Sequence, residues 1–329
     1  MDQMSDIKLV KQLTKTRDEF NAEISKRVLG QQEIIDHILI ALLCKGHTLL
    51  VGVPGLAKTL LIKSIAELLD LNFSRIQFTP DLMPSDITGT EIIEEDQKSG
   101  KREFRFFKGP IFGNIILADE INRTPPKTQA ALLQAMQEHN VTTAGQTYVL
   151  EEPFFVLATQ NPIEQEGTYP LPEAQLDRFM FNIKIDYPSH EDEISIVKST
   201  TSEGDKKLNT IISRNDLLLY QELVRRVPIA DNVVDFAVEL VSKTRPKSDK
   251  SSSTIKDWIE WGAGPRASQY LVLGAKAKAI LDGRPAPEID DIKAMAKPVL
   301  RHRLITNFNA EAEGLSTDDI LTKLLEEKK

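Results

Sequence analysis

The segment TLLVGVPGLAKT, residues 48–59, most constrains what this 329-residue chain can fold into. A run of β-favouring apolar residues enters a turn of small residues, and a helix-like segment, KTLLIKSIAELLD, follows at once. This order of strand, small-residue turn and helix is the context in which the pattern G-x-x-x-x-G-K-[ST] binds phosphate. The match is incomplete, because Ala57 stands where the pattern has its last glycine. The remaining parts of a nucleotide site must therefore be sought elsewhere in the sequence.

In a phosphate-binding loop each part of the turn has its own task. The backbone N–H groups of the turn surround the phosphates, Lys58 reaches the β- and γ-phosphates, and the hydroxyl of Thr59 faces Mg²⁺. The alternative is an ordinary strand-to-helix turn with a solvated lysine. On the first reading, the nucleotide-binding residues here are Gly52, Pro54, Gly55, Leu56, Ala57, Lys58, Thr59 and Leu60.

Two carboxylates follow a second apolar run, NIILADE, which ends in Asp119 and Glu120. A loop that hydrolyses ATP needs a carboxylate near the metal and a group that polarises water. Asp119 is suited to the Mg²⁺ and Glu120 to the role of general base. The alternative is that the two acids cap the helix predicted from PPKTQAALL.

Three further residues complete the candidate site. Asn161 ends the run FFVLATQNP, and the proline after it holds Asn161 extended at the carboxyl edge of the predicted sheet, where it can bridge water and the γ-phosphate. Arg178 in LPEAQLDRF and Arg266 in WGAGPRASQYL can each stabilise charge in the transition state. The alternatives are a turn-forming asparagine and two surface or salt-bridge arginines.

The hydrophobic pattern predicts the fold class. Short apolar runs alternate with helix-like segments from about Leu49 to Ile185, which indicates an α/β domain with a parallel sheet covered on both faces. Beyond Tyr187 the strand signals fade and helix starts of the form S-x-x-[DE] repeat, at residues 189, 213 and 316. We expect an αβα domain over residues 1–187 and a smaller all-helical domain over 188–329.

Charge and composition disfavour several function classes. A net charge of −8 disfavours a broad electrostatic hold on nucleic acid. The single cysteine, Cys44, lies in an apolar run and cannot form an internal disulfide, so it is expected to be a small buried hydrophobe in a reducing compartment. No run of 18 apolar residues occurs, so we expect a cytoplasmic protein without membrane insertion.

Taken in order, GVPGLAKT, IILADE, ATQNP, LPEAQLDRF and GPRAS resemble the AAA+ ATPases, and within them the MoxR family, from VLGQQEII to LRHRLITNF. The resemblance implies a P-loop NTPase domain followed by a helical lid. The five segments correspond to Walker A, Walker B, sensor 1, arginine finger and sensor 2. It also implies that Arg178 acts on a neighbouring subunit, that Arg266 contacts phosphate within its own chain, and that Val28 and Leu29 pack on adenine.

The resemblance extends to Ala57, since members of this family commonly carry alanine before the lysine. The physical hypothesis is that the backbone at this position keeps a negative φ and needs a small side chain, without glycine's freedom. Residues 88–110 and 141–154 are predicted to form hairpins that interrupt the αβα core. They resemble insertions of this AAA+ branch that face a ring pore or partner proteins.

The implied function is hydrolysis of ATP with Mg²⁺ by a ring, expected to be a hexamer, that remodels or matures partner proteins. A von Willebrand A domain protein is the expected kind of client. Two alternatives stay open at this point. One is a nucleic-acid-remodelling AAA+ motor, against which the acidic charge argues, and the other is an ATP-binding scaffold with little turnover, against which Glu120 and Asn161 argue.

Overall fold

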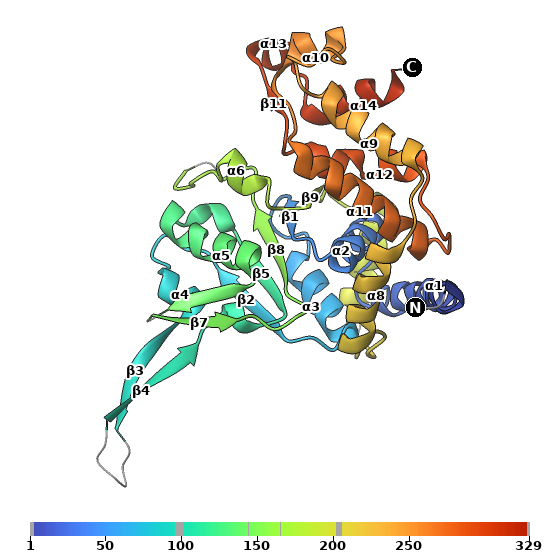
Figure 1. The fold of residues 1–329 in the computed structure, drawn as a ribbon. Helices are drawn as coiled ribbons and strands as arrows, with labels where there is room; N and C mark the ends of the chain where they lie inside the picture. Colours follow the sequence, from blue (N-terminus) through green and yellow to red (C-terminus); the bar gives the residue numbers. More distant parts are fainter. Residues whose placement is uncertain (1–2, 96–101, 144, 165, 202–205, 328–329) are drawn as a thin grey trace.

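The computed structural model describes residues 3–95, 102–143, 145–164, 166–201 and 206–327 (Figure 1). A five-stranded sheet lies at its centre, with every neighbouring pair parallel, in the order β2-β5-β8-β1-β9. This confirms the predicted parallel sheet. The strands are β1 (Thr48–Val51), β2 (Phe73–Gln77), β5 (Ile115–Asp119), β8 (Phe155–Gln160) and β9 (Phe181–Lys184).

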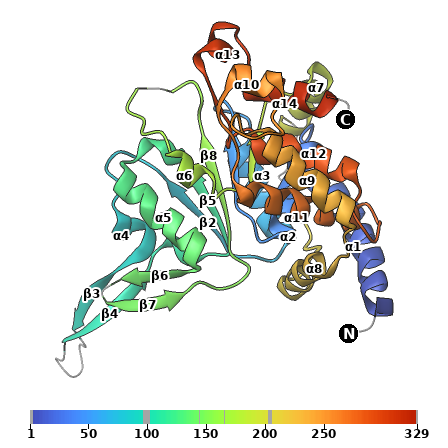
Figure 2. The same cartoon turned by 45° about the horizontal axis from the view of Figure 1, so that its top comes forward.

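Both faces of the sheet are buried. Successive side chains of a strand point to opposite faces, so each strand can contribute to a buried cluster on either side. On β5, Ile115 and Leu117 belong to one buried cluster and Ile116 and Ala118 to another. Figure 2 shows the sheet between two layers of helices. The first cluster takes residues from α2 (Gln32–Leu43) and α3 (Lys58–Leu68), and the second takes them from α5 (Pro126–Glu138).

The chain beyond β9 is helical, as the sequence predicts. Serines 189, 213 and 316 each accept a hydrogen bond from the backbone N–H three residues on, which confirms the three predicted helix caps. The helices are α7 (His190–Thr200), α8 (Arg214–Arg226), α9 (Asp231–Lys243), α10 (Ser253–Trp258), α11 (Pro265–Leu281), α12 (Ile289–Leu300), α13 (Phe308–Ala312) and α14 (Thr317–Glu326). A short antiparallel pair, β10 (Ile259–Trp261) with β11 (Ile305–Thr306), lies among them.

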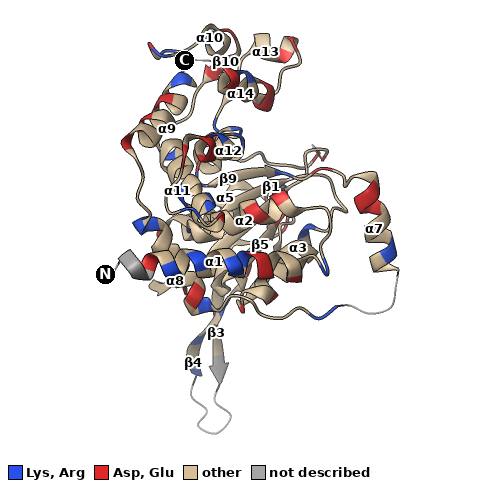
Figure 3. Cartoon of the chain, turned by 90° about the vertical axis from the view of Figure 1, so that its right-hand side faces the viewer, with Lys and Arg blue, Asp and Glu red and all other residues tan. Residues whose placement is uncertain are grey.

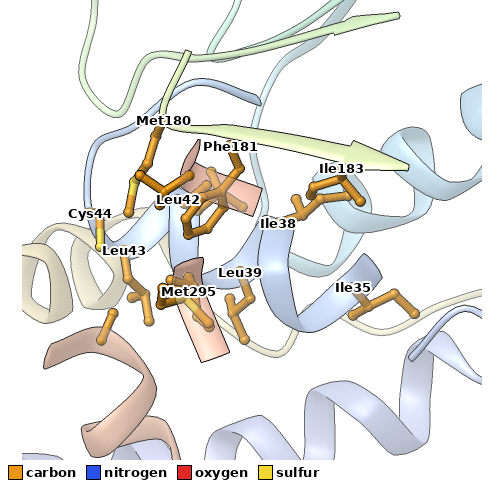
Figure 4. Packing of buried hydrophobic residues seen from close by; sticks show 14 of the residues in the cluster. Ile35, Ile38, Leu39, Leu42, Leu43, Cys44, Met180, Phe181, Ile183 and Met295 are labelled. Atoms are coloured by element: carbon orange, nitrogen blue, oxygen red, sulfur yellow. The ribbon is translucent and has the colours of Figure 1, made fainter. Parts of the chain in front are cut away.

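The helical part packs directly on the sheet and its helices. Leu39 and Leu42 of α2 meet Phe181 of β9 and Met295 of α12 in one buried cluster (Figure 4). Helix α1 (Gln3–Ile24) contributes to the same cluster and contacts α3, α8 and α11. In contrast, α7 has no buried residue and carries acidic side chains in its first turn (Figure 3). No helix in the described ranges is long and apolar enough to cross a membrane.

Two antiparallel hairpins lie beside the buried cluster that takes residues from α5. Strand β3 (Gly89–Glu95) pairs with β4 (Arg102–Lys108), and β6 (Asn140–Thr143) pairs with β7 (Gln146–Val149). The rings of Phe106 and Tyr148 stack at 4.4 Å between centroids and join the two hairpins. The connection at 96–101 lies outside the described residues. The remaining short elements are α4 (Pro84–Thr88), α6 (Glu173–Leu176) and the 3₁₀ turns η1 (Pro110–Phe112) and η2 (Ile121–Arg123).

Candidate functional site

The predicted phosphate-binding loop connects β1 to α3, where the sequence places it. Gly52 is required by a close approach, because a Cβ at this position would lie 2.0 Å from Cγ2 of Ile185. Gly55 has φ +86° and no atom within 4 Å of the position that its Cβ would occupy. The first N–H groups of α3 follow this turn and have no partner within the helix.

Ala57 adopts φ +54° and ψ +25°, directly before the first residue of α3. The prediction of a negative φ is therefore wrong. The chain turns from Gly55 into the helix through a left-handed residue, and the carbonyl of Ala57 then accepts the N–H of Leu61 at 2.9 Å. A left-handed conformation costs an alanine about 1 kcal/mol. The usual pattern has glycine at this position because glycine adopts the left-handed conformation without strain. In this chain alanine adopts the same conformation with strain.

Lys58 lies within electrostatic range of both predicted carboxylates. Burial lowers the pKa of its ammonium group, while the charges of Asp119 and Glu120 oppose that shift. The ammonium donates a hydrogen bond to the carbonyl of Gly52 in its own loop. The structure therefore brings together the phosphate loop and the end of β5, two segments that are separated by 60 residues of sequence.

Both carboxylate oxygens of Asp119 are hydrogen-bonded. Oδ1 accepts from the hydroxyl of Thr159 at 2.7 Å. Oδ2 accepts from Nη2 of Arg75 at 2.6 Å and from Nε of the same guanidinium at 3.2 Å. The residue that is predicted to face the metal is thus held from two sides by neighbouring strands, β8 and β2.

Glu120 lies just beyond β5 in a left-handed conformation, with φ +57° and ψ +51°. Its backbone N–H donates to Oγ1 of Thr159 at 2.9 Å. Its carboxylate accepts from Nε2 of Gln77 at 3.1 Å and from Nη1 of Arg123 at 3.0 Å. A non-glycine residue in this conformation persists only where the surroundings enforce it, and such residues gather at functional sites.

Asn161 is buried directly after β8, at the same carboxyl edge of the sheet. Its side-chain Oδ1 accepts the backbone N–H of Ile163 at 3.1 Å. The turn-forming reading of the sequence therefore applies, and the role of Asn161 toward water and the γ-phosphate stays a prediction. Asn161 directly follows β8, the strand next to the one that ends in Asp119.

The two predicted arginines have different partners, and one of those partners is shared with a third arginine. Arg178 donates to the carbonyl of Leu133 on α5 at 2.7 Å. Arg266, at the start of α11, forms an ion pair with Asp177, the residue before Arg178. The other oxygen of Asp177 accepts from Nε of the buried Arg303 at 2.8 Å. The ion pair with Asp177 thus connects Arg266 to the segment that carries Arg178.

Val28 and Leu29 differ in their exposure. Val28 is buried in the large core, and Leu29 is half-buried. The segment that carries them touches the phosphate loop, because Nε2 of Gln31 donates to the carbonyl of Leu56 at 3.2 Å. This contact places the predicted adenine-binding segment next to the loop.

Sequence reasoning missed the residues that hold the two carboxylates. Arg75 and Gln77 alternate on β2, so their side chains share one face of an edge strand. Thr159 is a polar residue inside an otherwise apolar strand, FFVLATQ. Polar positions in strands of a covered sheet were the available signal, because such strands are normally continuous apolar runs.

These residues fit Mg²⁺ and ATP. Carboxylate and hydroxyl oxygens, here of Asp119 and Thr59, are the ligands that Mg²⁺ prefers. The small-residue turn and the first N–H groups of α3 suit phosphate oxygens. Lys58 adds positive charge at the same place. The donor set is thus that of a P-loop ATPase.

Comparisons with known proteins agree with this geometry. Residues 47–181 match the family model for the ATPase family associated with various cellular activities (AAA), and residues 252–324 match the model for the AAA lid domain. Chaperone MoxR1 of Mycobacterium tuberculosis is 42% identical over 306 residues, which cover 92% of this chain and 79% of the relative. The uncharacterised protein YeaC of Bacillus subtilis is 42% identical over 92% of this chain and 91% of its own length.

A solved structure shows the same fold over the full length. The crystal structure of a proposed ATPase from Cytophaga hutchinsonii superposes with a TM-score of 0.92 at 43% identity, covering 100% of this chain and 99% of that one. The fold and the site define an AAA+ ATPase with a helical lid. Within that class, the chain belongs to the MoxR family of chaperone-like AAA+ ATPases.

Proposed function

We propose that this protein hydrolyses Mg²⁺-bound ATP in an oligomeric ring, with a hexamer as the expected form, and uses the energy to remodel or mature partner proteins. The observation that carries the proposal is the meeting of Lys58 with Asp119 and Glu120 at one edge of the sheet. Residues 1–187 would form the nucleotide-binding domain and residues 188–329 the lid, and a cytoplasmic location is part of the proposal.

Each residue of the site has a separate task in this proposal. Lys58 and the N–H groups of the loop bind the phosphates, and Asn161 orients the attacking water. Glu120 takes a proton from that water as its oxygen bonds to the γ-phosphorus and the bond to the β–γ bridging oxygen breaks, which leaves ADP and phosphate. A magnesium ion held by Thr59 and Asp119 would neutralise charge on the phosphate oxygens.

We also propose that Arg178 acts on the nucleotide of a neighbouring subunit and that Arg266 contacts the phosphate bound by its own chain. Arg266 forms an ion pair with Asp177, the residue next to Arg178, so the alternative is that both arginines act on the neighbour. Arginines that act across an interface make hydrolysis depend on assembly, and in GTPases such residues contribute about 10³ to 10⁵ in rate.

Mixing experiments test the shared site. Arg178→Ala and Glu120→Gln subunits are each expected to have little ATPase activity alone. A mixed ring would recover activity, because an intact Glu120 site then receives Arg178 from its Glu120→Gln neighbour. Mixtures no more active than either variant alone would count against a site that is shared between subunits.

The same design separates the two possible placements of Arg266. If Arg266 acts on the neighbour, Arg266→Ala mixed with Glu120→Gln recovers activity. If it acts within its own chain, every site in the mixture lacks one required group and activity stays low. The phosphate-release rate of purified mixtures, measured against total protein concentration, gives the answer.

The client is proposed to be a protein, with a von Willebrand A domain protein as the expected kind. A Glu120→Gln variant that binds ATP without hydrolysing it should hold its client longest, so it serves as the trap for affinity capture. Stimulation of ATPase by the purified captured protein would support the remodelling function. Stimulation by DNA with a steep salt dependence would instead favour a nucleic-acid motor.

A further inference from the structure

One buried hydroxyl joins both acidic residues of the site. Thr159 lies on β8 with 1% of its surface exposed, next to β5, which ends in Asp119. Its Oγ1 accepts the backbone N–H of Glu120 at 2.9 Å and donates to Oδ1 of Asp119 at 2.7 Å. Thr159 is thus bonded to both members of the acidic pair, once through a backbone and once through a side chain.

The direction of each bond is fixed by chemistry. The backbone N–H of Glu120 can only donate, so the hydroxyl oxygen must accept it. An ionised carboxylate can only accept, so the hydroxyl proton must go to Asp119. The hydroxyl rotor is therefore held in one orientation, and the bond to the carboxylate is of the stronger, charge-assisted kind.

Each bond fixes something that the proposed reaction needs. The bond to Glu120 holds its N–H in the left-handed turn, and that turn sets the direction in which the Glu120 side chain leaves the backbone. The bond to Asp119 fixes the rotation of the carboxylate, so that its oxygens are not interchangeable. Oδ1 accepts from Thr159, and Oδ2 accepts from Arg75, whose side chain is 47% exposed.

We propose that Thr159 is a positioning residue of the ATP site. It orients the carboxylate of Asp119 toward the metal, and it holds the backbone of Glu120 so that the Glu120 side chain points toward the attacking water. This inference rests on the proposed function of the site. Groups behind the residues that contact a metal typically contribute about 10- to 100-fold in metal affinity or activity.

The chain offers a matched control on the neighbouring strand. Thr48 of β1 is also a fully buried threonine in the central sheet. Its hydroxyl has no hydrogen-bond partner among the residues that the structure describes. Thr48→Val therefore removes a buried threonine hydroxyl from the same sheet without touching the acidic pair.

The test uses the full chain and three variants, Thr159→Val, Thr159→Ser and Thr48→Val. Calorimetric titration with ADP, with and without Mg²⁺, measures how strongly the metal improves nucleotide binding. Steady-state hydrolysis gives kcat and KM for ATP, and thermal unfolding followed by circular dichroism reports stability. The titration does not depend on turnover.

We expect Thr159→Val to reduce kcat by about 10- to 100-fold with a change in KM below about threefold, and to reduce the improvement of ADP binding by Mg²⁺ by about tenfold. Thr159→Ser keeps the hydroxyl and should restore both to within about threefold. Thr48→Val should leave both unchanged.

Two results would overturn the inference. In one, Thr159→Val and Thr48→Val lose the same amount of activity and melting temperature, which would make Thr159 only a structural residue. In the other, Thr159→Val keeps wild-type kcat and Mg²⁺ dependence. Failure of the proposed function looks different, because the wild-type protein itself would then show no Mg²⁺-dependent hydrolysis of ATP.

Discussion

The carboxylates at the end of β5 and the carboxylate of Asp177 are both paired with arginines, but these arginines differ in burial. Arg75 and Arg123, which hold Asp119 and Glu120, have side chains that are 47% and 42% exposed. Arg303, which holds Asp177, has a side chain that is only 2% exposed. Exposed pairs contribute little to stability and break easily, whereas a buried pair is costly to break.

This difference distinguishes two regions. The end of β5 is a candidate functional site, whereas Asp177 and Arg303 form a structural contact between the helical part and the sheet, which we call the joint. Because Arg75 and Arg123 are partly exposed, water would solvate their charges if a ligand displaced them from the carboxylates. Arg303 instead donates to Asp177 and to the carbonyl of Phe179, and so fastens the helical part to the chain that leads into β9. The charged groups at the end of β5 are accessible to a ligand, whereas the pair of Arg303 and Asp177 maintains the arrangement of the two parts.

The largest expected effect is on Glu120. Glu120→Gln removes the proton acceptor and should lower kcat by about 10² to 10⁴-fold, equivalent to about 3 to 5 kcal/mol in activation free energy, while ATP binding is retained. Phosphate release and equilibrium nucleotide binding measure the two quantities. Glu164→Gln is the control, because Glu164 also lies near Arg123, at 3.9 Å. Equal losses of kcat in the two variants would remove Glu120 from the role of general base.

The next effect concerns the joint. Arg303→Met leaves Asp177 without its buried partner and should lower the free energy of unfolding by about 3 kcal/mol. Arg266→Met, which removes the more exposed partner of the same carboxylate, should cost less than about 1 kcal/mol. Urea unfolding of both variants gives the comparison. The distinction between site and joint fails if Arg266→Met is the more destabilised of the two.

The smallest effect is expected at Arg75. Arg75→Ala breaks a half-exposed pair and should change the free energy of unfolding by less than about 1 kcal/mol. Because Arg75 holds Oδ2 of Asp119, its removal should free that oxygen and lower the Mg²⁺ concentration needed for tight ADP binding by about fivefold. Titration of ADP binding with Mg²⁺ checks this. An unchanged or higher Mg²⁺ requirement would show that Arg75 does not compete for Asp119.

Much of the fold could be predicted, because it depends on local patterns. All five strands of the sheet coincide with β-favouring runs of the sequence, of which β1, β5 and β8 are mainly apolar, and three helix starts coincide with serine caps. Parallel strands of a covered sheet carry few polar residues, so their apolar runs are easy to recognise. The short pair β10–β11 was not predicted, because segments of 3 and 2 residues carry no readable periodicity.

The candidate site could be predicted only in part. Lys58, Asp119 and Glu120 follow strands at one edge of the sheet, so their meeting is a consequence of parallel topology. Thr159, Arg75 and Gln77 contact the acids through strands that are neighbours in space and distant in sequence. The backbone conformation of Ala57 was predicted wrongly. The residue type indicates only which conformations are low in energy, whereas the geometry of the turn determines which one is adopted.

The order of motifs along the chain was enough to define a P-loop ATPase with a helical second part, because strand ends, helix starts and residue chemistry are local properties. Which arginine meets which carboxylate was decided by the tertiary structure. The strand order β2-β5-β8 brings Arg75 and Thr159 to Asp119 from opposite sides, and the packing of α11 and α12 brings Arg266 and Arg303 to Asp177. The packing of the apolar cores determines which charged side chains come into contact, and that packing is a property of the whole chain.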